Sequence, residues 1–402
     1  MRLVSIGEIC ALRNGRAFKP SEWSTSGTPI IRIQNLTDDT KPFNYCEFEV
    51  DSKFHVENGN LLFSWSGTPG TSFGAFFWRR ERGYLNQHIF RIDPYDPGNL
   101  NLEYFRLALN SKLEEIINQA HGGVGLQHIT KEKLNKVKVY LPEFNDQLRI
   151  AHLLGKVEGL IAQRKQHLQQ LDDLLKSVFL EIFGDPVLNE KGWETKEITD
   201  VCDEIVDCVN KTAPQAEEPT HFVMVRTSNI RGGKISLANV KYVDAKTYSI
   251  WTRRSKPRIG DILFTREAPM GEAGLIDFED QIFLGQRIVQ YRCNLNAANP
   301  KFILELMKTR FFQRQVEKLG KGSTVKHLAV PDCFKFIVIA PPLPIQNQFA
   351  VIVEKVEGIK SSYQQSLTDL ETLYGALSQQ AFKGELDLSR VPLPSESKSH
   401  AA

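Results

Sequence analysis

The sequence predicts an α+β protein with two tandem mixed α/β lobes, two long antiparallel coiled-coil helices that separate them, and a pseudo-twofold internal repeat. Two observations support this prediction. An ordered series of short motifs in residues 3–183 recurs in residues 195–384, and each series ends in a long stretch of heptad-spaced apolar residues. Motifs that recur in a fixed order indicate repeated structural units, and sustained heptads indicate coiled-coil helices.

Each lobe is expected to contain short strands and one helix. Runs of β-branched and aromatic residues predict the strands, and apolar residues at helical spacing predict the helices. The expected strands are 30–33, 61–63, 89–92 and 137–140 in the first lobe, and 222–225, 262–264, 288–291 and 336–339 in the second. The expected helices are 104–120 and 300–319. The motifs that match are 32–36 with 226–230, 59–64 with 260–265, 85–89 with 284–288, and 141–147 with 342–348.

Each long helix carries a seam of residues in alternating steps of four and three, as at the a and d positions of a coiled coil. An amphipathic helix packed on its own lobe is the alternative. The first seam is Ile150, Leu154, Val157, Ile161, Arg164, Leu168, Leu171 and Leu175. The second is Ile352, Val356, Ile359, Tyr363, Ser366, Leu370, Leu373 and Leu377.

A polar residue interrupts both seams at the matching place, Arg164 in the first and Ser366 in the second. A polar seam residue commonly fixes the register of a coiled coil. We therefore hypothesise that the helices pair antiparallel with these two residues near each other. A helix of about 33 residues would then form a rod of roughly 50 Å with a lobe at each end.

The ends of the helices set the expected boundaries. Gly184 and Pro186 stop the first helix, and Gly384 stops the second. The polar, Ser- and Pro-containing tail is expected to be disordered. The expected segments are a first lobe at 1–145, a helix at 146–184, a second lobe at 192–345, a helix at 346–384 and the tail at 385–402.

Composition excludes several classes of protein. The chain has 402 residues with 50 Lys and Arg against 48 Asp and Glu, so it is not a strongly basic tail-type nucleic-acid binder. It has no apolar run near 18 residues, which argues against a membrane span, and no secretory signal pattern. Its six cysteines form no CxxC pair, so reduced thiols and a cytoplasmic location are expected, with no metal site.

Basic, amide and hydroxyl side chains gather in matching loops of the two lobes. Arg, Asn and Gln read base edges, whereas Ser, Thr and Lys hold phosphates. The loops differ more than the strand ends that flank them, which suggests that the two lobes read different sequences. For a single Gly-rich loop, a tight turn is the simpler interpretation. Gln87 with His88, and Gln286 with Arg287, could equally be structural polar pairs. The candidates in the first lobe are Arg16, Lys19, Arg32, Asn35, Ser64, Trp65, Ser66, Thr68, Gln87 and His88. Those in the second are Lys211, Arg226, Asn229, Arg231, Thr265, Arg266, Met270, Gln286, Arg287, Lys321, Ser323, Thr324 and Lys326.

The sequence presents no catalytic motif. It lacks a Walker loop, an H-E-x-x-H or G-x-S-x-G motif, and a Gly-rich turn suited to S-adenosylmethionine after an early strand. A non-catalytic DNA reader is therefore favoured, and no catalytic residue is assigned. Two other classes stay open: a self-sufficient DNA methyltransferase or nuclease, and a coiled-coil adaptor without a DNA role.

The order of these motifs over nearly the whole chain resembles the specificity subunit of type I restriction-modification systems. The segments that carry the resemblance are 260–266 (GDILFTR) with its counterpart 59–65 (GNLLFSW), 322–328 (GSTVKHL), and 341–344 (PPLP) with Gln346 and Gln348. The resemblance implies that each lobe is a target recognition domain that reads one half of a bipartite, asymmetric DNA site.

The resemblance also implies partners. The two helices would set the length of the unread spacer and dock two methyltransferase (modification) subunits, and with them the restriction motor-nuclease subunits. S-adenosylmethionine, ATP and magnesium would bind to those partners and none to this chain. The adenine to be methylated would be flipped into the pocket of the methyltransferase subunit. The host would be a bacterium or an archaeon.

Overall fold

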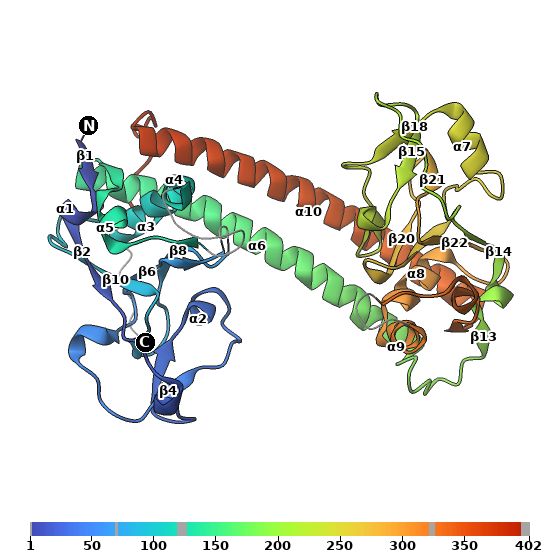
Figure 1. The fold of residues 1–402 in the computed structure, drawn as a ribbon, viewed down its shortest axis with the longest axis horizontal. Coiled ribbons are helices and arrows are strands. Elements are labelled where there is room, and N and C mark those ends of the chain that lie inside the picture. The colour runs from blue at the N-terminus through green and yellow to red at the C-terminus, as the bar shows by residue number, and fades with distance from the viewer. Residues whose placement is uncertain (1, 69–70, 119–126, 321–325, 395–402) are drawn as a thin grey trace. The chain divides into compact units, whose positions relative to one another are not determined.

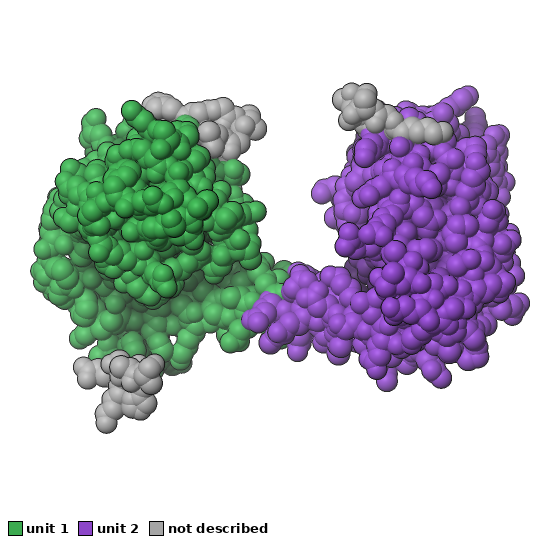
Figure 2. Space-filling view, turned by 90° about the horizontal axis from the view of Figure 1, so that it is seen from below, with its two compact units in different colours: residues 1–165, 365–402 green, residues 166–364 purple. Residues whose placement is uncertain are grey.

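The computed structural model describes residues 2–68, 71–118, 127–320 and 326–394, which divide into two units (Figures 1 and 2). Unit 1 comprises residues 1–165 and 365–402, and unit 2 comprises residues 166–364. The division falls inside two long helices, α6 (Phe144–Phe183) and α10 (Leu343–Lys383). Each unit therefore holds one lobe together with part of both helices.

The main sheet of unit 1 has four antiparallel strands in the order β2-β10-β6-β8. These are β2 (Cys10–Asn14), β10 (Ile89–Pro94), β6 (Leu61–Ser64) and β8 (Gly74–Phe77). A second sheet has the order β4-β3-β9-β5, from β4 (Asn44–Cys46), β3 (Thr28–Ile31), β9 (Gly83–Leu85) and β5 (His55–Val56). Two short pairs join β1 (Arg2–Ser5) to β12 (Lys138–Leu141) and β7 (Ser66–Gly67) to β11 (Gln127–His128). The helices are α1 (Ile6–Ile9), α2 (Ile33–Thr37), α3 (Leu102–Ser111), α4 (Leu113–Asn118) and α5 (Lys131–Lys136).

Unit 2 repeats this plan, which confirms the internal repeat. Its main sheet has the order β14-β22-β19-β20, from β14 (Cys202–Asp207), β22 (Ile288–Cys293), β19 (Ile262–Arg266) and β20 (Met270–Leu275). Its second sheet is β18 (Lys241–Val243), β15 (Phe222–Val225) and β21 (Gln281–Leu284). The short pairs are β13 (Thr195–Glu197) with β23 (Ile337–Ile339), and β16 (Ile230–Arg231) with β17 (Lys234–Ile235). The helices are α7 (Ala245–Trp251), α8 (Pro300–Lys308) and α9 (Arg310–Leu319).

Helices cover one face of each main sheet, in the segments where the apolar spacing predicts helix. In unit 1, α3 buries Tyr104 and Phe105 against strand residues that include Phe63. The helix also lies against β8 (Figure 1). In unit 2, α8 buries Phe302 in the same core cluster as Phe264. The expected helix at 104–120 is divided between α3 and α4, with residues 119 and 120 outside the described part, and the one at 300–319 is divided between α8 and α9.

The two long helices run antiparallel within unit 1. The hydroxyl of Tyr374 donates to a carboxylate oxygen of Glu158 at 2.9 Å. Further along α6, Lys165 pairs with Glu371 at 2.9 Å. As the residue number rises on α6 it falls on α10, which is the direction expected from the seams.

The same direction holds within unit 2. The rings of His167 and Tyr363 lie with centroids 5.6 Å apart. Nearer the end of α6, Phe179 meets Phe349 edge to face at 5.6 Å. Residues of α6, Phe179 among them, also sit in the core of the lobe. The helix α6 therefore contributes both to the helix pair and to the core of the second lobe.

The buried stripe of α10 differs from the expected seam. Ile359 and Leu373 are 44% and 47% exposed, whereas Val353 and Leu367, outside the expected seam, are buried. One residue turns a helix by about 100°, so a shift of one position moves a side chain off the interface. Apolar spacing alone predicted the seam, but the interface also uses long polar side chains. On α6, the expected seam residues from Ile150 to Leu175 are buried or half-buried. The proximity of Arg164 and Ser366 stays a prediction.

The first part of the tail is ordered on unit 1, unlike the expectation for 385–402. Leu386 and Leu388 pack against the core of this unit. The Nε of Arg149 donates to the carbonyl of Val391 at 3.0 Å. Two leucines at alternate positions give this polar segment an apolar face that outweighs its composition. Residues 395–402 lie outside the described part.

A network of ion pairs ties α10 to α6 and to the lobe in unit 2. Glu357 pairs with Lys234 at 2.8 Å and with Lys360 at 2.6 Å, and Lys360 also pairs with Asp172 at 2.7 Å. Burial alone would raise the pKa of Glu357, but the bonds from Lys234 and Lys360 lower it below the usual value of 4.5. The carboxylate form is therefore favoured in the folded chain.

We expect this network to make unit 2 sensitive to acid. A carboxyl group with a depressed pKa stabilises the fold above the pKa of the unfolded chain, near 4.5, and loses that contribution as the pH falls through the folded value. Urea unfolding of the chain and of Glu357→Gln should differ by at most about 1 kcal/mol at pH 7. The difference should shrink below pH 4.5. A difference independent of pH would contradict the network.

Buried thiols give a second test of the fold. Burial, then the carboxylate of Asp93, raises the pKa of Cys10 to about 12, and burial raises that of Cys333 to about 12. Because the thiolate is the nucleophile, iodoacetamide at pH 8 should label both far more slowly than the half-buried Cys202. Mass spectrometry after timed labelling measures this. Equal labelling rates in the native chain would contradict the burial.

Among the described helices, none has a segment long and apolar enough to cross a membrane. The described residues also contain no group of three or more metal-ligating side chains.

Candidate nucleic-acid interface

A short link joins the second sheet to the main sheet at the same place in both lobes. Residues 86–88 connect β9 to β10 in unit 1, and residues 285–287 connect β21 to β22 in unit 2. His88 and Arg287 end the links with positive φ angles of 74° and 69°. Non-glycine residues seldom adopt this conformation, and where they do it often marks a functional site. Gln87 and Gln286 precede them and are exposed in both lobes.

The two links rest on different supports. In unit 1, Gly15 lies so close to the link that a Cβ there would be 1.9 Å from the carbonyl oxygen of Asn86. Cys208 has the matching place in unit 2, since Gly15 donates its amide to Ile89 and Cys208 donates its amide to Ile288. The sulfur of Cys208 accepts the amide of Arg287 at 3.0 Å. The same strand arrangement therefore holds the two links through different contacts.

A pocket of about 530 Å³ lies beside the link of unit 1. It brings together three residues that the sequence predicted, Arg32, Gln87 and His88. The sequence did not identify three further polar or aromatic residues that complete it: Trp23, Gln34 and Asn86. Apolar Phe18, Pro20 and Ile33 form the rest of the lining. Gln34 could have been found, because it lies inside the repeated motif where the second lobe has a serine.

Arg16, another predicted contact, is held by its own lobe. Its Nη2 pairs with Glu22 at 2.5 Å. Its guanidinium lies 4.8 Å from the ring centroid of Phe18 and 5.1 Å from that of Phe48. Lys19, three residues along, is exposed. Arg16 thus packs against residues of its own lobe near the pocket, whereas the side chain of Lys19 is exposed to solvent.

Several predicted contacts prove to be buried structural groups. Asn35 is 2% exposed, and its side-chain oxygen accepts the amide of Arg32 at 3.1 Å. Asn229 is 6% exposed and accepts the amide of Arg226 at 3.0 Å. The two asparagines therefore close the same turn in both lobes. Their match in the sequence reflected a shared fold rather than base contacts.

The hydroxyl residues that end β6 and β19 are buried as well. Ser64 and Thr265 are both fully buried. Ser64 donates to the carbonyl of Ser66 at 2.9 Å, and Thr265 donates to that of Pro269 at 2.6 Å. Ser66 itself is 5% exposed. Buried polar groups need such partners, and these hydroxyls have them inside the lobe.

Trp65 and Arg266 hold the links to the rest of each lobe. The amide of Trp65 donates to the carbonyl of His88 at 3.1 Å, and that of Arg266 to the carbonyl of Arg287 at 2.8 Å. The Trp65 ring lies 4.8 Å from that of His88. Arg266 donates from Nη1 to the carbonyl of Leu328 at 2.9 Å. The backbone amides of both residues therefore support the links, while the Trp65 ring lies beside His88 and the Arg266 side chain is hydrogen-bonded to Leu328.

His88 is a neutral group at neutral pH. Burial, followed by the neighbouring His128, lowers the pKa of His88. The two rings have centroids 6.4 Å apart. A neutral imidazole can both donate and accept a hydrogen bond, which suits recognition of base edges or backbone groups.

Most of the predicted arginines of unit 2 have partners within the lobe. Arg226 donates from Nη2 to the carbonyl of Asn239 at 2.6 Å, and Arg231 donates from Nη1 to that of Thr227 at 2.8 Å. Arg287 forms an ion pair with Glu267. Met270 packs against the core of the lobe. The predicted side chains that are exposed in the described part of both units include Lys19, Thr68, Gln87, Lys211, Gln286 and Lys326. Lys321, Ser323 and Thr324 lie outside the described residues.

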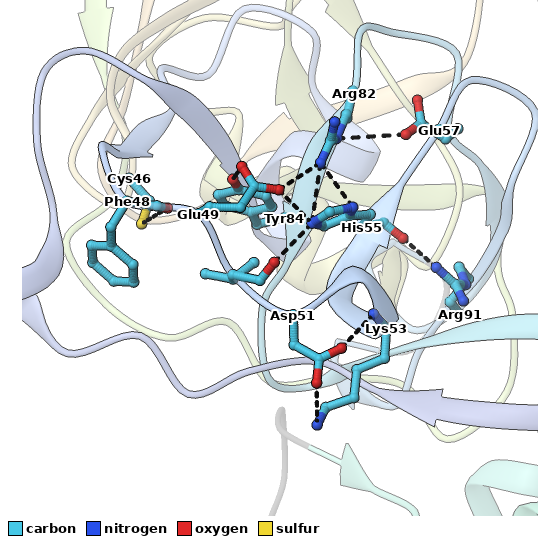
Figure 3. A network of polar contacts seen from close by, with 11 residues as sticks. Cys46, Phe48, Glu49, Asp51, Lys53, His55, Glu57, Arg82, Tyr84 and Arg91 are labelled. Carbon is cyan, nitrogen blue, oxygen red and sulfur yellow. Dashed lines mark hydrogen bonds and ion pairs between the residues drawn. The ribbon is translucent and has the colours of Figure 1, made fainter.

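A polar network connects residues of the second sheet of unit 1 and the segments beside it (Figure 3). Glu49 accepts from the hydroxyl of Tyr84 at 3.0 Å and pairs with Arg82 at 2.9 Å. The ring of His55 stacks on that of Tyr84 with centroids 5.5 Å apart. Tyr84 is in β9, the strand that leads into the link, so the network fixes where the link begins.

A comparison with known proteins matches the two halves of the chain separately. The family model described as the type I restriction modification DNA specificity domain matches residues 1–172 and residues 190–371. The EcoBI specificity subunit of Escherichia coli is 21% identical over 95% of this chain and 85% of its own length. The MjaVIII specificity subunit of Methanocaldococcus jannaschii is 20% identical over 76% of this chain and 73% of its own.

Two solved structures share the fold. The S subunit of the type I restriction-modification system from M. genitalium has a TM-score of 0.61 at 14% identity, covering 95% of this chain and 96% of that chain. A chain from structural work on complex assembly and conformational transition of the type I R-M system has a TM-score of 0.51 at 15% identity, covering 96% and 98%. With the family model matching both halves of the sequence, the chain belongs to the type I restriction-modification DNA specificity family.

Proposed function

We propose that each lobe of this chain reads one half of a bipartite, asymmetric DNA site as part of a type I restriction-modification complex. Specificity subunits are the non-catalytic members of these complexes, and this chain is one by family. The observation that most supports two readers is the pair of matching links. Both have an exposed glutamine and a left-handed residue on the same frame, yet the surrounding side chains differ.

The differences fall where base contacts would be made. Asn86 and His88 in the first lobe correspond to a glycine and Arg287 in the second, and Gln34 corresponds to Ser228. Side chains with different donors and acceptors select different base edges. Two lobes with equal frames and unequal side chains would therefore read two different half-sites.

The helices would carry the partner subunits. Exposed apolar residues lie along both of them: Leu160 is 46% exposed and Leu174 47% on α6, and Ile359 is 44% exposed and Leu373 47% on α10. Exposed apolar side chains on a paired helix suit docking of a further protein surface. We propose that two methyltransferase subunits dock there, and with them the motor-nuclease subunits. S-adenosylmethionine, ATP and magnesium would bind to those partners, in the cytoplasm of a bacterium or archaeon.

Binding to a randomised pool of DNA duplexes tests this function. The chain is mixed with a matching methyltransferase subunit, and the shifted duplexes are sequenced. Enrichment of one bipartite sequence is the expected result. Strong binding without sequence preference would contradict it. Binding of S-adenosylmethionine by the isolated chain would instead favour a self-sufficient methyltransferase, and absence of DNA binding would favour an adaptor.

A further inference from the structure

Two matching arginines have different surroundings in the two lobes. Arg32 and Arg226 occupy the same place in the repeated motif, and each donates its backbone amide to the asparagine three residues ahead. The backbone therefore presents both side chains in the same way. Nη2 of Arg226 donates to the carbonyl of Asn239 at 2.6 Å. Arg32 lies over the ring of Trp23, 5.4 Å from its centroid.

Within the described residues, the guanidinium of Arg32 has no hydrogen bond and no ion pair. No carboxylate lines its pocket, and the nearby Glu22 is engaged by Arg16 at 2.5 Å. The planar face of Arg32 is occupied by Trp23, which restricts its orientation while leaving its N–H donors free. The pocket therefore presents an oriented cation that lacks an acceptor.

Hydrogen bonds within the lobe orient two of the side-chain amides around Arg32, those of Gln34 and Asn86. Gln34 donates from Nε2 to the carbonyl of Pro42 at 3.1 Å, which leaves its side-chain oxygen as an acceptor. The side-chain oxygen of Asn86 accepts the amide of Gln87 at 2.9 Å. The side chain of Gln87 extends from the link. An oriented arginine flanked by amides is suited to the edge of a base pair, where donors and acceptors alternate.

Taking the proposed function as the starting point, we infer that Arg32 recognises a guanine of the first lobe's half-site through its O6 and N7 atoms. This is the commonest specific contact that arginine makes in the major groove. Arg226, whose Nη2 is hydrogen-bonded to the carbonyl of Asn239 and whose Nε is buried, is assigned a structural role in the second lobe. The two half-sites would then differ in the contact made at this matched position.

The test measures base preference at each position of both half-sites. The full chain with its methyltransferase partner is given duplexes that vary one base pair at a time. Arg32→Ala should lower discrimination for guanine at one position of one half-site by about 10- to 100-fold. Preferences at the other positions should persist. Arg226→Ala, the matched control, should retain the base preferences of both half-sites.

Arg32→Lys separates base recognition from phosphate contact. Lysine keeps the charge and the aliphatic stem but lacks the planar fork, so it should recover only part of the guanine preference. If Arg32 contacts a phosphate, Arg32→Ala would weaken binding to all sequences equally and Arg32→Lys would restore it. That result would overturn the inference, as would unchanged preference in Arg32→Ala. If the unsubstituted chain lacks a bipartite preference, the proposed function itself fails.

Discussion

Insertion of one heptad into each long helix is expected to lengthen the unread spacer of the DNA site by about three base pairs. Seven residues add roughly 10 Å to an α-helix, and base pairs are stacked about 3.4 Å apart. Seven residues also preserve the phase of the coiled-coil seam. The insertions belong after residue 165 in α6 and after residue 364 in α10, where the chain divides into its two units.

Selection from duplexes with spacers of different length measures this effect. A heptad inserted in α6 alone is the control, because it leaves the antiparallel helices unequal in length and should impair binding to every spacer. With both insertions, the two half-site sequences should be unchanged and only their separation should grow. A spacer of unchanged length would contradict the proposal that the helices set the distance between the two half-sites.

Replacement of Phe183 by alanine is expected to destabilise unit 2 by about 3 to 5 kcal/mol. Phe183 ends α6 and is fully buried. Its ring centroid lies 5.0 Å from that of Phe179, 4.7 Å from that of Phe302 and 5.3 Å from that of Phe349. These neighbours belong to α6, α8 and α10, so the substitution opens a cavity where three helices meet.

Leu180→Ala is the matched control for this cavity. Leu180 lies one turn earlier on the same helix and is 50% exposed. Its loss should change stability by no more than about 0.5 kcal/mol. Hydrogen exchange of amides in β19 and β22 measures the local stability of unit 2. Equal effects of the two substitutions would show that Phe183 does not anchor α6 in this core.

The fold could be predicted because the same ordered motifs occur in both halves of the sequence. The strands expected at 61–63 and 262–264 lie within β6 and β19. The first long helix, expected at 146–184, corresponds to α6, which begins two residues earlier. The seam of α10 was only partly predictable. Lys360 forms an ion pair with Asp172 on α6, whereas Ile359 is 44% exposed, and apolar spacing cannot show such a polar contact.

The candidate site was less predictable because a repeated motif can be conserved between lobes for folding alone. Asn35 and Asn229 matched well in the sequence, and both close a buried turn. Gln34 and Asn86, which line the pocket, stand where the two halves differ. The positions that vary within a matched frame were therefore the better guide to the residues that line the pocket.

Methylation profiling of DNA modified in cells by this chain together with its methyltransferase partner tests the central claim most directly. Two lobes on one chain predict a methylated motif of two different short sequences separated by a gap of fixed length. A continuous motif without a gap, or two identical half-sites, would contradict the account of two unequal readers.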